Sequence, residues 1–239
     1  MNIPTESHPL KPFLPEGARL LMLGSFPPKR ERWSMEFFYP NWINDMWRIW
    51  GDIFFGDKHH FEVKGEKRFD HERIVSFCHE HGIALYDTAC EVRRLKDNAS
   101  DKFLEVVTPT DIGALLAQLP HCKAIVTTGQ KATETLAEQF GCAIPAVGTS
   151  TPITLGSRTL TFWRMPSTSR AREGQGAGFA AIVLASAFMT MRHLVLRSSV
   201  MSRLGKLSLV QKIVASYALC DESFAVFSLS EEKSFPFLM

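Results

Sequence analysis

The sequence predicts an α/β fold in which a short, mostly parallel sheet lies between two layers of helices. Short apolar runs alternate with segments of helical periodicity over residues 18–172. The runs are almost continuously apolar, which is typical of parallel strands that are covered on both faces. An alternation of strands and helices implies right-handed crossovers between parallel strands. We therefore expect a three-layer α/β/α domain.

The predicted strands are short, and each ends at a turn of unusual composition. They cover Ala18–Gly24, Ile83–Asp87, Ala124–Thr128 and Thr159–Met165. The turns that follow them read GSFPP, Asp87-Thr88, Thr128-Gly129-Gln130 and PSTSR. Ligands of parallel α/β sheets bind beyond the carboxyl ends of the strands. The four turns are therefore the place to expect a binding site.

Helical periodicity fills the segments between these strands. The predicted helices cover Asn44–Phe54, Phe69–Glu80, Ile112–Leu119 and Gln130–Phe140. Thr110-Asp111 supplies an N-cap for the third helix, and Gly129 opens the fourth.

The two ends of the chain differ from this central domain. Residues 1–17 are rich in proline and lack the apolar core of a signal peptide, so we expect an extended N-terminal strap and a cytoplasmic protein. After a flexible EGQGAG break, residues 173–239 are predicted to form a C-terminal helical or poorly ordered extension. That extension is either a helical cap or a segment whose reading frame has departed from that of related chains. No apolar run approaches the roughly 20 residues of a membrane span, and we expect a monomer.

Basic residues cluster beside three of the predicted turns and loops, although the net charge is only +2. The clusters are Lys29, Arg30 and Arg32; Lys64, Lys67 and Arg68; and Arg164, Arg170 and Arg172. Basic groups placed in this way fit a surface that follows a phosphate backbone, and solvated surface charge is the plainer interpretation.

Cysteine and histidine patterns indicate no metal site. The five cysteines are dispersed without a CxxC pair, so we interpret them as free thiols in a reducing compartment. His59 and His60 are adjacent on a charged loop and are expected to be surface residues. No metal or other cofactor is predicted.

Five landmarks in the same order resemble those of the uracil-DNA glycosylase superfamily. They are GSFPP from Gly24, FFYPNWINDMW (Phe37–Trp47), GIALYDT (Gly82–Thr88), AIVTTGQKATETL from Ala124, and MPSTSRA (Met165–Ala171). The resemblance covers residues 18–172. It is strongest to the branch with GSFP and PSTS turns, which includes hypoxanthine-type and mismatch-type glycosylases.

The resemblance implies a monofunctional DNA glycosylase that acts in base-excision repair. Such an enzyme flips a deaminated or mismatched base, of the uracil or hypoxanthine class, into a pocket and hydrolyses the N-glycosidic bond. The expected partner is damaged or mismatched DNA. The implied catalytic residues are Asp87 and Asn44. The implied base-binding residues are Gly24, Ser25, Phe26, Phe38, Tyr39 and Asn41. The implied DNA-backbone residues are Lys29, Arg30, Pro166, Ser167, Thr168, Ser169 and Arg170.

Three positions depart from the superfamily pattern. Phe26 stands where the first turn of better-known members carries Asn or Asp to position the attacking water. Met165 begins the last turn in place of His or Asn. Asp87 replaces the Asn that reads uracil, and a carboxylate only accepts hydrogen bonds. Asp87 would suit a base that presents N–H donors, such as hypoxanthine, or it would orient the water.

Each site residue also has a purely structural interpretation. Asp87 would cap the turn that follows it, and Asn44 would cap the following helix. Phe38 and Tyr39 would be ordinary core residues, and the hydroxyls of residues 167–169 would cap their own loop. At the level of function, the alternatives are a non-catalytic nucleic-acid-binding relative of the glycosylases and an N-ribosyl hydrolase of free nucleosides.

Overall fold

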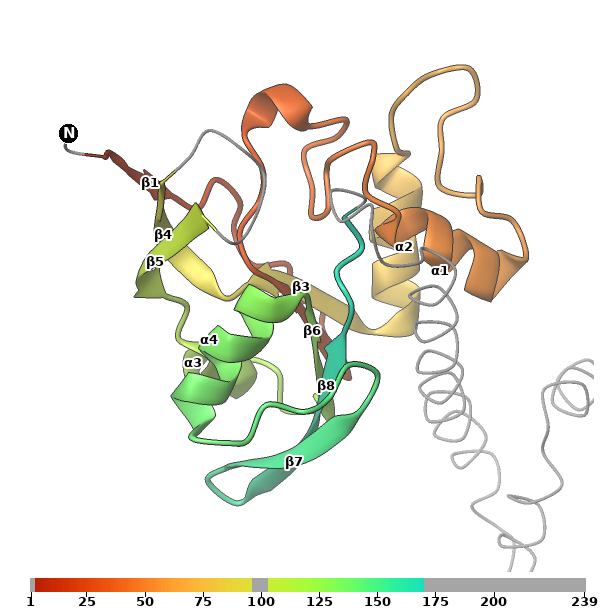
Figure 1. Cartoon of the computed structure of the whole chain (residues 1–239). Helices are drawn as coiled ribbons and strands as arrows, with labels where there is room; N and C mark the ends of the chain where they lie inside the picture. The colour runs from red at the N-terminus through yellow and green to blue at the C-terminus, as the bar shows by residue number, and fades with distance from the viewer. Residues whose placement is uncertain (1–2, 96–102, 170–239) are drawn as a thin grey trace, which may run out of the picture. The chain divides into compact units, whose positions relative to one another are not determined.

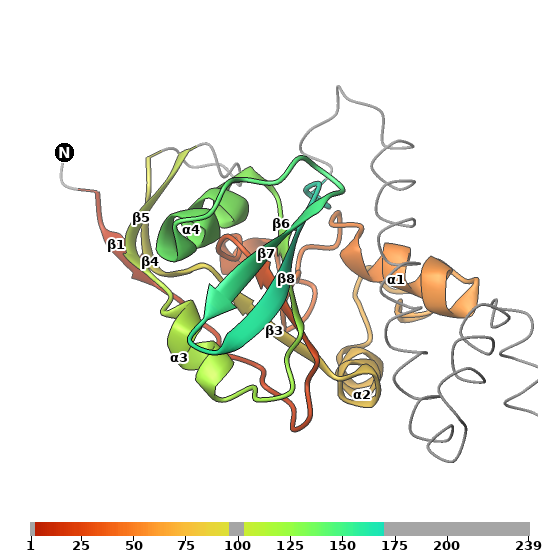
Figure 2. The same cartoon turned by 90° about the horizontal axis from the view of Figure 1, so that it is seen from below.

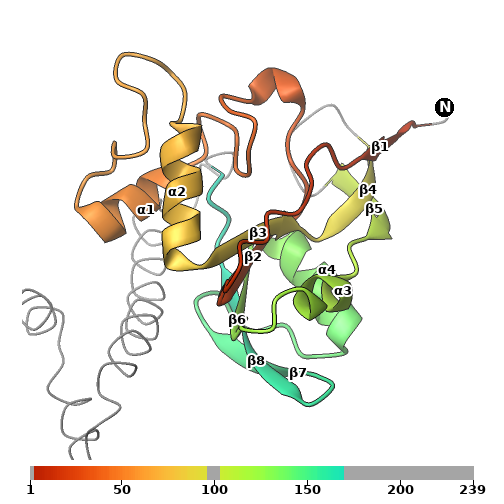
Figure 3. The same ribbon diagram turned by 180° about the vertical axis from the view of Figure 1, so that it is seen from behind.

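The computed structural model describes residues 3–95 and 103–169. A five-stranded sheet in the order β3-β2-β6-β8-β7 forms its centre. Helices α1 and α2 cover one face of this sheet, and α3 and α4 cover the other (Figures 1, 2 and 3). The predicted three-layer α/β/α architecture with a mostly parallel sheet is confirmed.

The strands of the central sheet are β2 (Leu20–Gly24), β3 (Ile83–Asp87), β6 (Ala124–Thr128), β7 (Ser150–Leu155) and β8 (Arg158–Met165). All neighbouring pairs are parallel except β7 with β8, which is antiparallel. The four predicted strands are present, and β7 was not predicted. In the register, Gly24 lies opposite Asp87 and Thr128 lies opposite Met165. The pairing therefore gathers the ends of the four parallel strands at one edge.

A second, antiparallel sheet was also absent from the prediction. It contains β1 (Thr5–Ser7), β4 (Ala89–Arg94) and β5 (Leu104–Pro109) in the order β1-β4-β5. Strand β4 follows β3 after a single residue, Thr88, whose N–H donates to the Gly24 carbonyl over 2.9 Å. The N-terminal strap thus joins the fold through β1 and through a bridge between Phe13 and Leu85.

The four predicted helices are present with small shifts at their ends. They are α1 (Met46–Phe55), α2 (His71–His81), α3 (Ile112–Ala117) and α4 (Gln130–Phe140), and a 3-10 turn, η1 (Arg30–Arg32), precedes them. The side chain of Asp70 accepts from the Arg73 N–H at the start of α2, and that of Asp111 accepts from the Ala114 N–H at the start of α3. None of the described helices is both long and apolar enough to cross a bilayer.

A dense aromatic cluster joins α1, α2 and the loop between them. Trp47, Trp50 and Phe61 are almost fully buried, and their rings contact one another or Phe77 at centroid distances of 5.1–6.1 Å. Aromatic pairs at this spacing add to the free energy of area burial. The cluster packs α1 firmly against α2, and α1 directly follows the segment that carries Asn41 and Asn44.

Candidate functional site

A pocket opens where the parallel strands end. Its lining comes from the last residues of β2, β3 and β6, from the turns after β2 and β8, from the segment before α1, and from the second sheet. The residues are 24–28, 38–41 and 167–169, with Asn44, Asp87, Arg94, Leu104 and Thr128. Its volume is about 100 Å³. A single water needs roughly 10–15 Å³, so the pocket has room for a considerably larger group.

The structure brings most of the sequence-predicted site residues to this pocket. Its lining includes Asp87 and Asn44, and also Gly24, Ser25, Phe26, Phe38, Tyr39, Asn41, Ser167, Thr168 and Ser169. Lys29, Arg30 and Pro166 do not line it. Arg170 and the predicted extension at 173–239 lie outside the described residues.

The carboxylate of Asp87 is buried and faces a histidine that the sequence analysis did not single out. The ring Nε2 of His8 lies 2.9 Å from Asp87 Oδ2, and the two side chains are 2 % and 10 % exposed. His8 comes from the N-terminal strap, directly after β1. A lone histidine in a proline-rich segment carries no local signal of this role, because the contact depends on strand pairing across the chain.

Gly24 allows the other carboxylate oxygen to lie close to the backbone of β2. A Cβ atom at this position would stand 2.3 Å from Asp87 Oδ1 and 3.8 Å from the Tyr39 hydroxyl. Thr110 holds the same strand end, because its hydroxyl donates to the Asp87 carbonyl over 2.8 Å. The first turn therefore needs glycine because any side chain would displace the acid.

Tyr39 sits beside this acid in an unusual backbone conformation, with a φ of 51°. Its hydroxyl lies 3.0 Å from the hydroxyl of Thr128, at the end of β6. Burial raises the pKa of Tyr39 well above its ordinary value, and the hydrogen bond to Thr128 only partly opposes that shift. The phenol is therefore neutral at physiological pH and can act as a hydrogen-bonding group.

Arg94 and Phe26 form the wall of the pocket on the side of the second sheet. The guanidinium of Arg94 bonds to the carboxylate of Glu6 over 2.9 Å and to the Pro27 carbonyl over 2.6 Å, and it lies 5.5 Å from the Phe26 ring centre. Phe26 in turn packs on the buried cluster of Ala89, Val92 and Leu104. The sequence analysis missed Arg94.

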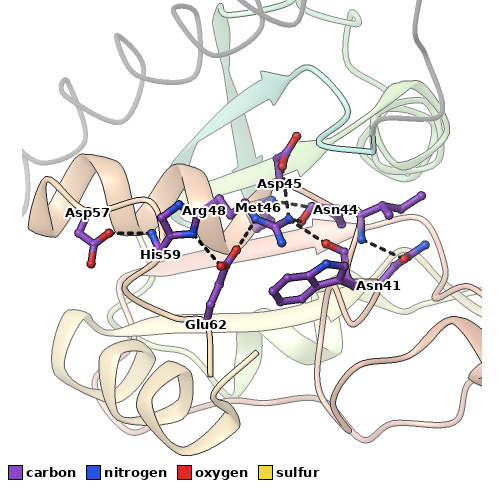
Figure 4. A network of polar contacts seen from close by, with 10 residues as sticks. Asn41, Asn44, Asp45, Met46, Arg48, Asp57, His59 and Glu62 are labelled. Atoms are coloured by element: carbon purple, nitrogen blue, oxygen red, sulfur yellow. Dashed lines mark hydrogen bonds and ion pairs between the residues drawn. The ribbon is translucent and has the colours of Figure 1, made fainter. Parts of the chain in front are cut away.

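Asn41 and Asn44 line the pocket from the segment before α1, which is held by their own side chains (Figure 4). The side-chain oxygen of Asn41 accepts from the Ile43 N–H over 3.2 Å, and that of Asn44 accepts from the Met46 N–H over 2.9 Å at the start of α1. Asn44 thus binds the first residue of α1 from two positions upstream, although Asp45 is the N-cap, and it also lines the pocket. A carbonyl oxygen has two lone pairs, so the bond from Met46 leaves it able to accept again.

Arg48 fixes the same segment from one turn further along α1. Its NH1 donates to the carbonyls of Trp42 at 2.7 Å and Asn44 at 3.3 Å, while Nε pairs with Glu62 at 2.5 Å. Glu62 also binds His59 over 2.7 Å (Figure 4). The guanidinium lies over the Trp42 ring at 4.4 Å. This network holds the backbone of residues 42–44 in place.

The turn that follows β8 docks on the start of α1. The Asp45 N–H donates to the Thr168 carbonyl over 3.1 Å, and Asn44 and Ser169 form an isolated β-bridge. The Ser167 hydroxyl accepts from the Ser169 N–H over 3.3 Å, which is the loop-capping contact expected of a purely structural turn. Met165 is fully buried and does not line the pocket.

The basic groups near the turns differ in their surroundings. Arg30 is exposed, pairs with Glu36 at 2.6 Å and lies 4.9 Å from the Trp33 ring centre. Arg164 instead donates to the Pro145 carbonyl and the Gln130 side chain, so it serves the fold. Lys64, Lys67 and Arg68 are exposed on their loop.

Metal-ligating side chains do not gather in the described part of the chain. No group of three or more His, Cys, Asp or Glu residues there could hold a metal ion. His60 stacks on Phe55 with ring centres 3.6 Å apart, and His59 pairs with Glu62. Cys78 and Cys122 are buried free thiols, and burial raises the pKa of each.

Comparison with solved structures supports the fold. A solution NMR structure of a "putative Uracil DNA glycosylase" from Methanosarcina acetivorans matches with a TM-score of 0.53 and 20 % sequence identity. The match covers 78 % of this chain and 99 % of that chain. A family model described as AzlC protein matches residues 171–239, which the structure does not describe. No curated protein matches the chain.

Because Gly24 and Asp87 approach each other closely, we expect the free energy of unfolding to depend strongly on the size of the residue at position 24. Gly24→Ala should lower the free energy of unfolding by about 1–3 kcal/mol, because the new methyl group displaces the carboxylate. In an Asp87→Ala background most of that cost should vanish. Urea unfolding of the four proteins measures this coupling. If Gly24→Ala lowered the free energy of unfolding equally with and without the Asp87 side chain, the new methyl group would clash with a group other than Asp87.

We expect the Tyr39 phenol to titrate at a higher pH in the native protein than in the unfolded protein. The difference in absorbance at 295 nm between the wild type and Tyr39→Phe should rise only well above pH 10 in the native protein, and near pH 10 in urea. The native state keeps a proton that the unfolded state loses, so Tyr39 lowers stability as the pH rises above 10. A native transition near pH 10 would show that the hydroxyl is hydrated.

Proposed function

We propose that this chain is a monofunctional DNA glycosylase that removes a deaminated or mismatched base of the uracil or hypoxanthine class. The supporting observation is the pocket at the carboxyl ends of the parallel strands, in which aromatic walls surround one buried acid. The fold shared with the Methanosarcina acetivorans protein is consistent with this chemistry. The domain proposed to carry the activity is residues 18–172, with residues 1–17 as a strap that contributes to the site.

Asp87 is the proposed proton acceptor. Among the described residues that line the pocket, Asp87 is the only one with a carboxylate, and Arg94 is the only one with a basic side chain. In the proposed reaction the C1′–N bond breaks and its electron pair leaves with the base. A water then adds to C1′, and the carboxylate accepts the proton that the water loses. The base leaves as an anion and takes up a proton from solvent, and Asp87 returns its proton to solvent, so that the net products are the free base and an abasic site.

The flipped base is enclosed by aromatic and amide groups. Phe26, Phe38 and Tyr39 all line the pocket, and Phe38 is almost fully buried. Stacking of a base on an aromatic ring contributes about 1–3 kcal/mol, which offsets part of the unstacking cost. Asn44 offers both amide donors and an oxygen with a lone pair still available to the base or to the water.

The DNA backbone is proposed to follow the turn at Pro166–Ser169 and the basic groups after the first turn. Ser167 and Ser169 are half-buried at the rim of the pocket, and Lys29 and Arg30 are exposed. Hydroxyl and basic groups of this kind contact phosphates without reading sequence. Binding should therefore weaken steeply with salt, unlike binding of a free nucleoside.

One observation favours a second candidate, a non-catalytic nucleic-acid-binding relative. Phe26 is packed into an apolar wall and Met165 is fully buried, so neither can orient a water. In that case the pocket would bind an extruded base without cleaving its glycosidic bond.

The test uses the purified chain and duplexes that carry uracil, hypoxanthine, xanthine or a G·T mismatch. Alkali converts the abasic sites into strand breaks. We expect breaks with one of these substrates after alkali and none without it. Asp87→Ala should lower the single-turnover rate about 10²–10⁴-fold, because it removes the proton acceptor.

Asp52→Ala is the matched control, because Asp52 is an exposed carboxylate on α1 that does not line the pocket. It should leave the rate unchanged. Salt-dependent DNA binding without any cleavage would replace the glycosylase proposal with the non-catalytic one. Hydrolysis of free nucleosides without salt-dependent DNA binding would indicate the nucleoside hydrolase.

A further inference from the structure

His8 does not line the pocket itself, but its side chain is enclosed directly behind two lining residues, Asp87 and Phe26. Its backbone N–H donates to the Cys90 carbonyl over 2.7 Å, which extends the pairing of β1 with β4 by one residue. Its ring centre lies 4.7 Å from that of Tyr86 and, in a T-shaped contact, 5.2 Å from that of Phe26, and its side chain is only 2 % exposed. A polar side chain this well enclosed has its orientation set by packing.

Both ring nitrogens of His8 have partners. Nε2 faces Asp87 Oδ2 at 2.9 Å. Nδ1 lies 2.8 Å from the Leu10 carbonyl oxygen and 3.2 Å from the Leu10 nitrogen. The doubly protonated ring donates to both acceptors, and the neutral ring with its proton on Nε2 accepts from Leu10. An ionised carboxylate can only accept, so opposite ionised Asp87 the ring carries its proton on Nε2 and donates it; the tautomer with its only proton on Nδ1 would face Asp87 with a lone pair.

We infer that His8 is a positioning residue for Asp87, so that the N-terminal strap completes the catalytic pocket. This inference rests on the proposed glycosylase function. The bond from His8 occupies Oδ2 and leaves Oδ1 on the side of Gly24 and Tyr39, where it can meet the water. A carboxylate in aromatic surroundings also needs a hydrogen-bond donor to remain charged. His8 supplies that donor from a strand far away in the sequence.

Three substitutions separate this role from general packing. The amide nitrogen of Gln lies near the place of a histidine Nε2 and can still reach Asp87, whereas that of Asn lies near the place of Nδ1 and cannot. We expect His8→Asn and His8→Ala to lower the maximal single-turnover rate about 100-fold, the size of effect that misplacing a catalytic group produces. His8→Gln should stay within about tenfold of the wild type.

The substrate is the duplex that the wild-type protein cleaves fastest among those carrying uracil, hypoxanthine, xanthine or a G·T mismatch. The half-saturating protein concentration should change less than about threefold, because His8 is proposed to act on Asp87 and not on DNA. His8→Ala combined with Asp87→Ala should be no slower than Asp87→Ala alone. Ser7→Ala, an exposed residue of β1, is the control for the strap.

Each outcome decides a different claim. A wild-type chain that cleaves none of the duplexes overturns the proposed function and this inference with it. An active wild type whose folded His8→Asn variant keeps its rate overturns the inference alone. Losses that multiply in the double variant, or equal losses in the Gln and Asn variants, would also show that His8 does not act through Asp87. Circular dichroism confirms that each variant is folded, and His8→Gln provides the comparison if His8→Ala is not.

Discussion

A carboxylate that is largely removed from water must be hydrogen-bonded or neutralised, because it loses its hydration. Asp87 is such a group, and much of the structure around the pocket serves its placement. Gly24 gives one oxygen room beside β2, and His8 binds the other. The parallel register of β2 and β3 brings Gly24 and Asp87 together. The acid is thus placed by two parts of the chain that are distant from it in the sequence, β2 and the N-terminal strap.

The second sheet connects the N-terminal strap to Asp87 and to the first turn. Strand β4 begins after the single residue that follows Asp87, and β1 pairs with it, which brings His8 of the strap to the Asp87 carboxylate. Arg94, on β4, ties the strap to the first turn because it bonds to Glu6 and to the Pro27 carbonyl. The strap and the first turn therefore form one unit with the acid, although they are distant along the sequence.

The sequence predicts those features that depend on local pattern. Apolar runs and caps locate the four parallel strands and four helices, and the unusual composition of their turns locates the pocket. His8 and Arg94 lie beyond such patterns, because their roles arise from the pairing of β1 with β4. Strand β1 is only three residues long, and β4 reads ACEVRR, whose polar residues do not resemble a buried strand. A pairing between two such segments is specified by the packed structure and not by either segment alone.

The positions of the polar groups in the pocket depend on these distant contacts. Phe26 gives the first turn an apolar wall, so that any water must be held from other sides. Asp87 is fixed by the strap, and Asn44 is fixed by its bond to Met46 and by the hold of Arg48 on its carbonyl. Catalytic groups lose effect when they are misplaced by about 1 Å. Under the proposed function, Asp87 and Asn44 on these rigid supports would take the role of a polar first turn in holding the water.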